Sequence, residues 1–543
     1  MSSFERVGLH KSRCVSNGSL IVTKHPIATE VGRDVLASGG NAIDAAIACS
    51  FTLGVVEPYM SGLGGVGLAL VYANQALSVL DAGPVAPRNL DVDRYRLAGD
   101  DPDTDLFGWP RVVDDANLLG ATSVCVPTTV ALMEALYTQG ASLPWRRLVE
   151  PAISLARRGY APDWLLTLSI AQDQRSLGRM DATRRIFLPE DHIPAYDMDG
   201  VGHPVFRQED LADTLEAIAT GGAGAFYRGE IADTLAHTIR HHGGDLDSAD
   251  LAEYSVRISS PIRVPIAGAD VWLTDGLNGG PTVAELLRLY DLLVSARTSR
   301  ESPAQLATWI RAARLALEDR FTVMGHQGQG ADIGTLAHAR RRTAGAPTPH
   351  VAPPAADSTT YLAVVDREGN GVSLNLTLLS RWGSKFIAPG LGVLLNNGMM
   401  WFDPMPERPN SIAPGARPLA NMAPAAVTRG DTLMMLLGAS GGRRIISAVP
   451  QILHNVLTFD MDIQDAIEAP RLEFTTDPML ADQRFTERTV VEVARSEGVA
   501  IGRYLPRLAS GGFSSPLGAH RTRDGRWAAG MDPTGLGTPA CTP

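Results

Sequence analysis

The chain has 543 residues, of which 45% are hydrophobic and 20% are charged, a composition typical of a globular protein with a sizeable core. This balance excludes a disordered or fibrous chain. The 59 acidic and 48 basic side chains give a formal net charge of −11, and no basic tract with interleaved aromatic residues indicates a nucleic-acid partner. We therefore expect a small-molecule ligand, without a metal ion or an organic cofactor.

The two ends of the chain and its cysteines favour a cytoplasmic protein. The first thirty residues lack the apolar segment of a signal peptide, and nowhere do about 18 apolar residues follow one another, so no membrane contact is expected. Four cysteines are too far apart for a local zinc motif and too few for a typical disulfide framework: Cys14, Cys49, Cys125 and Cys541.

The first half of the chain predicts helices around a glycine-rich hairpin. Residues 29–58 indicate two helices that are interrupted at Gly39-Gly40, because apolar residues recur there at helical spacing. Residues 61–84 predict a turn and two apolar strands, and residues 129–158 and 207–256 are mainly helical in pattern. Helical layers over a sheet follow, which places the protein in the α/β (α+β) class.

A change in composition divides the chain. Residues 327–358 are rich in Gly, Ala, Pro and Arg, which predicts a mobile connector. At Thr359 the pattern changes to an alternating strand, a Gly-Asn turn and a second strand. We expect a large segment, 1–358, and a small segment, 359–543. A chain cut before Thr359 fits this junction, and so does an ordinary change from loop to strand.

Thr359 is the candidate nucleophile. A threonine hydroxyl attacks a carbonyl only when a base takes its proton, and the α-amine of an N-terminal threonine is such a base, with a pKa of about 7.7–8.0. Before cleavage the same hydroxyl could attack the carbonyl of Ser358, so one side chain would serve both maturation and turnover. The alternative is that Thr359 and Thr360 are ordinary β-forming residues.

Gly441 and Gly442 are the candidate oxyanion site. They separate an apolar strand from a helix, and two amides at a helix N-terminus suit a developing negative charge. A tight strand-to-helix turn is the alternative. Between these glycines and Thr359, two loops offer the amides of Asn396, Asn397 and Asn421 to a pocket.

Eight segments in order give the chain a clear resemblance to the gamma-glutamyltranspeptidase family. They are ASGGNAIDAAIA at 37–48, LGVVEPYMSGLGGVG at 53–67, SVCVPTTVALMEAL at 123–136, AFYRGEIADTLA at 225–236, NGGPTVAELLRLYD at 278–291, TTYLAVVDREGNGVSL at 359–374, LLNNGMMWFDP at 394–404 and GASGGRRIISAVPQIL at 438–453. The resemblance implies a four-layer αββα sandwich of the N-terminal-nucleophile hydrolase type, cut between Ser358 and Thr359 into two subunits.

The resemblance also implies roles for particular residues. Thr359 is the nucleophile, Thr377 matches the threonine that assists its hydroxyl, and Gly441 and Gly442 match the oxyanion hole. The expected partners are a small-molecule substrate and the chain's own two subunits. Whether the cleaved heterodimer forms a homo-oligomer is left open.

The residues that hold the glutamyl group in the family are replaced in this sequence. The arginine for the substrate α-carboxylate falls on Gly83, an asparagine on Leu379 and the acidic residue for the α-ammonium on Trp401, while two serines become Ala420 and Asn421. A zwitterionic head would lose several hydrogen bonds among such residues. We therefore expect a flatter, less charged acyl group that packs against Trp401 and Leu379.

Other residues complete the expected substrate site, and two further functions stay open. Arg381 or Arg444 could supply the positive charge that is missing at Gly83, and Tyr361 and Asn397 are also assigned to substrate binding. One alternative is hydrolytic C–C cleavage of a keto acid, the reaction assigned to relatives that make lincomycin or pyrrolobenzodiazepine alkylproline units in antibiotic biosynthesis. The other is a non-catalytic binding protein that retains the fold.

Overall fold

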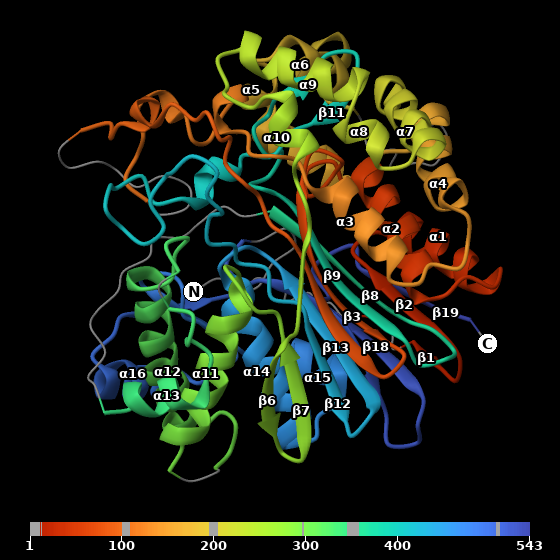
Figure 1. The fold of residues 1–543 in the computed structure, drawn as a ribbon. Coiled ribbons are helices and arrows are strands. Elements are labelled where there is room, and N and C mark those ends of the chain that lie inside the picture. The colour runs from red at the N-terminus through yellow and green to blue at the C-terminus, as the bar shows by residue number, and fades with distance from the viewer. Residues whose placement is uncertain are drawn as a thin grey trace.

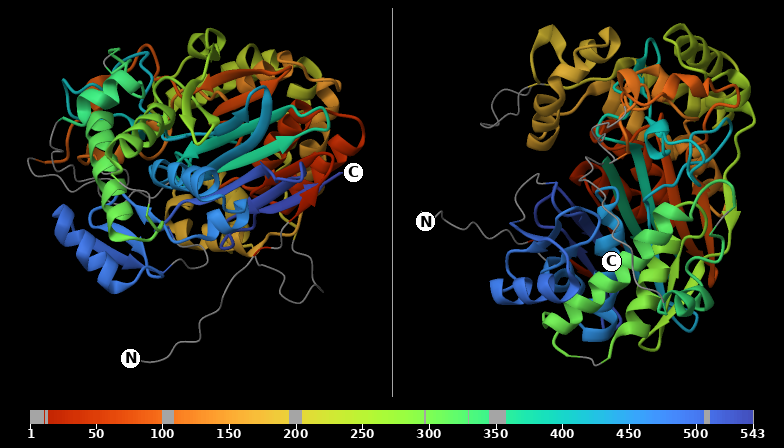
Figure 2. Two further views of the ribbon diagram at one scale, coloured as in Figure 1. Left: turned by 90° about the horizontal axis from the view of Figure 1, so that it is seen from below. Right: turned by 90° about the vertical axis from the view of Figure 1, so that its left-hand side faces the viewer.

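Two seven-stranded antiparallel sheets lie face to face, with helices on both outer sides (Figures 1 and 2). The computed structural model describes residues 11, 14–99, 109–194, 205–295, 298–328, 330–344, 358–505 and 511–542. This helix–sheet–sheet–helix order confirms the α/β class and the four layers that the sequence predicts.

The first sheet, here called the β8 sheet, is built mainly from the first half of the chain. Its order is β19 (Thr538–Cys541), β2 (Leu20–Thr23), β8 (Ser358–Val365), β9 (Gly371–Leu379), β3 (Val66–Ala73), β4 (Ala76–Ala82) and β5 (Arg257–Ser259). The second, the β13 sheet, has the order β1 (Val15–Ser16), β18 (Trp527–Met531), β17 (Ser515–Arg521), β13 (Thr432–Ser440), β12 (Ala425–Arg429), β7 (Ala269–Leu273) and β6 (Ile262–Ile266).

Each sheet has its own helical layer. Beside the β8 sheet are α1 (Pro26–Ala37), α2 (Ala42–Val56), α3 (Thr129–Thr138), α4 (Trp145–Arg158), α5 (Trp164–Leu177), α6 (Asp181–Phe187), α7 (Glu209–Gly221), α8 (Gly224–Tyr227), α9 (Glu230–His241) and α10 (Ser248–Ala252). Beside the β13 sheet are α11 (Gly279–Leu293), α12 (Pro303–Thr322), α13 (Leu336–Arg342), α14 (Arg444–Phe459), α15 (Ile463–Glu468) and α16 (Glu487–Glu497).

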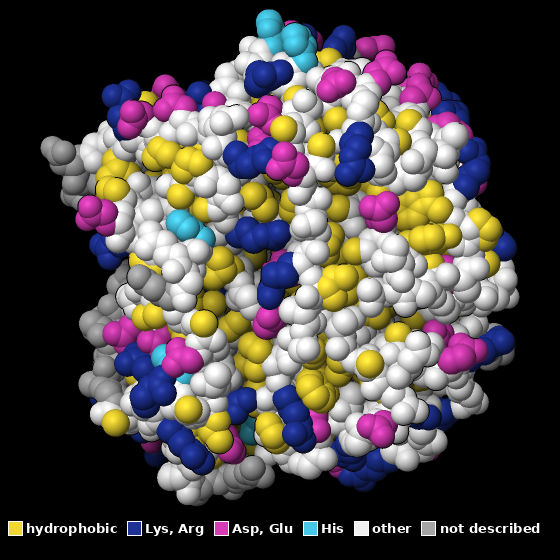
Figure 3. Space-filling view, in the orientation of Figure 1, with side chains coloured by type: hydrophobic (Ala, Val, Ile, Leu, Met, Phe, Trp, Pro, Cys, Tyr) yellow, Lys and Arg dark blue, Asp and Glu magenta, His cyan; other side chains and the backbone are white. Residues whose placement is uncertain are grey.

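Short strands complete the chain outside the two sheets. β10 (Ile387–Ala388) pairs with β11 (Val393–Leu394), and β15 (Met479–Asp482) lies between β14 (Leu472–Glu473) and β16 (Ile501–Tyr504). Acidic and basic side chains are interspersed over the face that Figure 3 shows, without a continuous basic stripe. Among the described residues, every helix is too short or too polar to cross a bilayer.

The inner faces of the sheets share one apolar core. Leu20 and Tyr361 of the β8 sheet pack there with Leu436 and Leu517 of the β13 sheet. The sheets are closely packed at Gly438, where an added Cβ would lie 2.2 Å from Cε2 of the Tyr361 ring. A glycine is therefore required for the ring to fit between the sheets.

The sequence predicts the main element boundaries correctly. α1 ends at Ala37 and α2 begins at Ala42, because the side chain of Asn41 accepts the amides of Ile43 and Asp44 and so starts a new helix. The expected strand-to-helix passage at Gly441-Gly442 is present between β13 and α14.

The predicted mobile connector at 327–358 is wrong in part. Residues 336–342 form α13, whose Arg342 donates hydrogen bonds to Glu318 and Asp319 of α12. Arg340 and Arg341 are exposed, and the ion pairs of Arg342 hold the helix against α12. Residues 345–357 of the connector lie outside the described part of the chain.

The C-terminal residues belong to the β8 sheet, and two cysteines differ from expectation. β19 pairs with β2 along its whole length, from Thr538 opposite Thr23 to Cys541 opposite Leu20. Cys541 forms a disulfide with Cys14 across 527 positions, so cysteine spacing no longer supports a reducing compartment.

Gly438→Ala should destabilise the protein by about 1–3 kcal/mol, since its methyl group would collide with the Tyr361 ring in a filled core. The midpoint of urea unfolding measures this change. Gly224→Ala is the matched control, because an added Cβ at Gly224 meets no atom within 4 Å. Equal midpoints for the two variants would contradict the close packing of the sheets.

Candidate active site

Thr359 lies at an irregularity in the pairing of β8 with β9. Ser358 is opposite Leu379 and Thr360 is opposite Leu376, so Thr377 and Leu378 of β9 together face the single residue Thr359. Such a bulge changes the direction of side chains at the end of a strand. Leu379 follows it with a φ of 84°, a conformation that non-glycine residues rarely adopt.

Two threonine hydroxyls converge on the carbonyl oxygen of Ser358. Thr359 donates from Oγ1 at 2.6 Å, and Oγ1 of Thr377 donates to the same oxygen. The Thr377 hydroxyl in turn accepts the amide of Leu379 at 2.8 Å, which fixes its orientation. Both donors withdraw electron density from the Ser358 carbonyl, which makes its carbon more open to attack.

The glycine pair follows directly after β13. Gly441 has a φ of 121° and Gly442 a φ of 54°, conformations that favour glycine, and they lead into α14. Within the described ranges, neither glycine amide donates a hydrogen bond to another residue. Two free amides at the start of a sixteen-residue helix can hold a negatively charged oxygen.

Asn375 of β9 links β13 to β8 through hydrogen bonds. Its side-chain amide donates to the carbonyl of Thr360 at 3.1 Å and to the carbonyl of Ala439 at 3.0 Å. Ala439 is two residues before Gly441. The buried side chain of Asn375 thereby fixes the position of β8 relative to β13 close to the glycine pair.

A cavity of about 580 Å³ is lined by both Thr359 and Gly441. Its wall includes four basic and three acidic side chains: Lys24, Arg381, Lys385, Arg444, Glu57, Asp173 and Asp532. Of the residues that the sequence assigned to the site, Thr359, Gly441, Arg381 and Arg444 line this cavity, and Thr377 and Gly442 lie immediately beside it.

Lys24 is a buried cation of the cavity wall. Its ammonium donates to the carbonyl of Ser515 at 2.9 Å and also contacts the Ser515 hydroxyl. Burial lowers the pKa of Lys24 to about 8, although Asp532 and Glu57 partly oppose this shift. The side chain is therefore cationic below about pH 8 and neutral above it.

The other charges of the wall are partly paired. Glu57 accepts the hydroxyl of Thr360 at 2.8 Å, and burial raises its pKa. Arg381 forms an ion pair with Asp173 of α5. Lys385 donates to the Ser380 hydroxyl at 3.1 Å, and burial lowers the pKa of Lys385 to about 8.

Leu379, Trp401 and Ala420, which the sequence assigned to substrate binding, do not line this cavity. They pack with Met400 and Met422 in one apolar cluster, each at most 3% exposed. Their side chains are thus part of the protein interior.

Four further residues that the sequence assigned to substrate binding form hydrogen bonds within the protein. The carbonyl of Gly83 accepts a hydrogen bond from Arg417, and the hydroxyl of Tyr361 is hydrogen-bonded to that of Ser373 between the sheets. Asn397 accepts the amide of Ser380 at 3.1 Å. The side chain of Asn421 accepts a hydrogen bond from Arg320, whose pKa burial lowers to about 9.

Sequence reasoning did not identify most residues of the wall, among them Lys24, Glu57, Lys385, Ser515 and Asp532. They come from distant parts of the chain, so no spacing connects them. One signal was present, because Lys24 and Lys385 are two of only three lysines among 48 basic residues.

The chain is similar to known proteins over almost its whole length. The Gamma-glutamyltranspeptidase family profile matches residues 28–541. The "Glutathione hydrolase proenzyme" of Bacillus subtilis (strain 168) is 29% identical over 496 residues, which are 85% of this chain and 82% of the relative. The "Acylase ACY 1 proenzyme" of Pseudomonas sp. (strain SE83) is 31% identical over 515 residues, 91% of this chain and 88% of the relative.

Solved structures share the fold. A cephalosporin acylase from Bacillus halodurans superposes with a TM-score of 0.86 at 24% identity, over 100% of this chain and 99% of the other. LmbA2991HD superposes with a TM-score of 0.82 at 21% identity, over 98% of this chain and 100% of the other. With the profile match over residues 28–541 and a relative at 31% identity, the chain belongs to the gamma-glutamyltranspeptidase family and is an N-terminal-nucleophile hydrolase.

Proposed function

We propose that the protein cleaves its own Ser358–Thr359 bond and that Thr359 then transfers the acyl group of an amide substrate to water or to an amine. The proposal rests on the contact between the Thr359 hydroxyl and the Ser358 carbonyl, because Thr359 lines the same cavity as Gly441. Relatives that are proenzymes support this proposal.

Maturation begins with attack of Thr359 Oγ1 on the Ser358 carbonyl carbon. The C–N bond breaks as the threonine nitrogen receives the proton, and an ester joins Ser358 to the threonine oxygen. Thr377 stabilises the negative oxygen of the intermediate through its hydroxyl. Water then hydrolyses the ester, which leaves a carboxylate on Ser358 and a free α-amine on Thr359.

Turnover uses the same hydroxyl. The new α-amine takes the proton from Thr359 Oγ1 as the oxygen adds to the substrate carbonyl. The free amides of Gly441 and Gly442 hold the negative oxygen, and the proton passes to the departing amine. Water, or a second amine, then releases the acyl group from the threonine.

The substrate that suits this cavity has an anionic acyl group without an ammonium group. Four basic and three acidic side chains line the wall, whereas Leu379, Trp401 and Ala420, at positions where the family resemblance implies polar partners of a glutamyl head, belong to an apolar cluster and do not line it. A carboxylate at the far end of the acyl chain can be held by Arg381 or Arg444, with Lys24 as a third cation. This arrangement replaces the expected stacking on Trp401.

Hydrolytic C–C cleavage of a keto acid is the second candidate. Arg381 and Arg444 could bind the carboxylate of a keto acid as well as that of an acyl amide. The two reactions differ in their products, because amide cleavage releases an amine and C–C cleavage releases none.

The purified protein should consist of fragments of 358 and 543 − 358 = 185 residues, measured by intact mass after reduction. Without reductant the fragments should migrate together, since Cys14 and Cys541 join them. Thr359→Ala should remain one uncut chain, while Thr360→Val should still be cut and Cys14→Ser should separate without reductant. An uncut wild-type chain would support a binding protein instead.

Arg381→Gln and Arg444→Gln should each raise KM for glutaryl-p-nitroanilide about 10–100-fold, because a charged hydrogen bond contributes about 1.5–3 kcal/mol. Steady-state assays of cleaved protein measure this effect. Arg263→Gln, which removes an exposed ion pair on β6, is the matched control and should leave KM unchanged. Efficient turnover of γ-glutamyl-p-nitroanilide would refute the proposed specificity.

Activity toward an anionic acyl group should fall above about pH 8, where Lys24 loses its charge. The Thr359 amine also ionises in this range, so the ratio of kcat/KM for glutaryl- and butyryl-p-nitroanilide is the useful measurement. This ratio should decline as the pH rises from 7 to 9, and Lys24→Met should lower it and weaken its pH dependence, with the remainder due to Lys385 of the same wall. A ratio independent of pH in the wild type would exclude Lys24 from substrate binding.

A further inference from the structure

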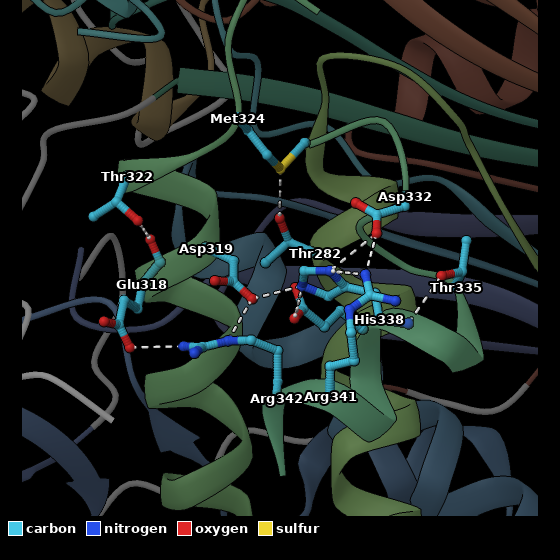
Figure 4. A network of polar contacts seen from close by, with 11 residues as sticks. Thr282, Glu318, Asp319, Thr322, Met324, Asp332, Thr335, His338, Arg341 and Arg342 are labelled. Atoms are coloured by element: carbon cyan, nitrogen blue, oxygen red, sulfur yellow. Dashed lines mark hydrogen bonds and ion pairs between the residues drawn. The ribbon is translucent and has the colours of Figure 1, made fainter. Parts of the chain in front are cut away.

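A second polar cluster is built among helices that lie outside the Thr359 cavity. Glu285 of α11, Asp319 of α12 and His338 of α13 place three potential ligand atoms within 4.8 Å of one another. Nε2 of His338 lies 2.8 Å from Oδ2 of Asp319 and 3.2 Å from Oε1 of Glu285. Figure 4 shows His338 turned from α13 toward Asp319.

The cluster is buried, and the carboxylate of Glu285 lacks well-directed hydrogen-bond donors. Glu285 is fully shielded from solvent and Asp319 is 4% exposed. Neither oxygen of Glu285 accepts a well-directed hydrogen bond from any residue in the described ranges. Burial raises the pKa of Glu285, and a buried carboxylate in this state requires a cation or a proton.

The two carboxylate ligands suit a divalent cation. Glu285 and Asp319 carry two negative charges when ionised, and Arg342 donates to Asp319 at 2.8 Å and to the neighbouring Glu318 at 2.7 Å. Nearby, Asp332 forms an ion pair with Arg341. Interactions with the carboxylates of Glu285 and Asp319 raise the pKa of His338 to about 9, so His338 is cationic at neutral pH; once a metal ion displaces its proton, the three ligands have a net charge of −2.

The outer contacts resemble those that hold metal ligands in place. Nδ1 of His338 lies 3.5 Å from the carboxylate of Asp332, on the side of the ring away from Glu285 and Asp319. A histidine that binds metal through one nitrogen commonly has a carboxylate or carbonyl at the other. Arg342 similarly fixes the orientation of the Asp319 carboxylate (Figure 4).

We propose that Glu285, Asp319 and His338 bind one divalent first-row metal ion, with Zn²⁺ as the preferred ion. One imidazole nitrogen and two carboxylate oxygens suit Zn²⁺ and, more weakly, Mn²⁺, whereas Mg²⁺ disfavours nitrogen. Two positive charges match the net charge of the group. None of the three ligands lines the Thr359 cavity, so the ion has a structural role that is independent of the proposed reaction.

The structural consequence concerns the end of the large segment. α13 is the last helix before the described chain stops at residue 344, and it resumes at Ser358, the residue before Thr359. A metal ion bridging α11, α12 and α13 would fix this helix to the β13 side of the molecule both before and after cleavage.

Titration calorimetry tests the proposal. Bound metal is first removed from the full chain with a chelator, and ZnCl₂ is then titrated into the protein. The expected result is one tight equivalent of Zn²⁺ and a rise in melting temperature, a weaker response to MnCl₂ and none to MgCl₂. Glu285→Gln and His338→Ala should each lose at least about 10-fold in affinity, and Asp332→Asn should lose less, as expected of an outer contact.

A matched control separates this site from a weaker one on the surface. His237 and His241 are exposed on α9 at i and i+4, a spacing at which imidazoles can also take up Zn²⁺. His237→Ala/His241→Ala should therefore keep the tight equivalent. Loss of all Zn²⁺ binding in this double variant would overturn the proposal, as would unchanged affinity in correctly folded Glu285→Gln and His338→Ala.

Discussion

Close packing of the β8 sheet against the β13 sheet brings the two halves of the site together. Tyr361 fits between the sheets only because Gly438 has no side chain, and Asn375 bonds carbonyls of both β8 and β13. These contacts hold the end of β13, and with it Gly441, beside the start of β8. A shift of either sheet would separate the threonine hydroxyl from the glycine amides, which must lie within hydrogen-bond reach of the same reacting carbonyl.

The replaced glutamyl-binding positions and the charges of the cavity form a consistent pattern. Leu379, Trp401 and Ala420, which the resemblance assigns to substrate binding, form an apolar cluster that is closed to solvent and does not line the cavity. Basic side chains are found in the cavity wall, where Arg381 is paired with Asp173 and Lys24 is hydrogen-bonded to Ser515. Under the proposed function, recognition in this site depends on the charge of the acyl group.

A disulfide and a group of ion pairs have different roles in holding the two segments. The Cys14–Cys541 disulfide joins the large segment to the small one, whereas Arg342 and His338 hold α13 to α12 within the large segment. Cleavage before Thr359 would leave both contacts in place. The disulfide therefore limits how far the cleaved subunits can move apart, and the ion pairs keep the last described helix of the large segment in its helical layer.

The sequence by itself determined the fold class, the helix break at Gly39-Gly40 and the passage from β13 into α14, because periodicity and glycine positions act locally. It also supplied the family, through motifs in order. Only the tertiary structure decided that Trp401 is core, that α13 is a helix, and that Lys24, Glu57 and Asp532 share a wall with Thr359. These outcomes depend on long-range packing and on burial of charge, and neither can be inferred from the distance between residues along the chain.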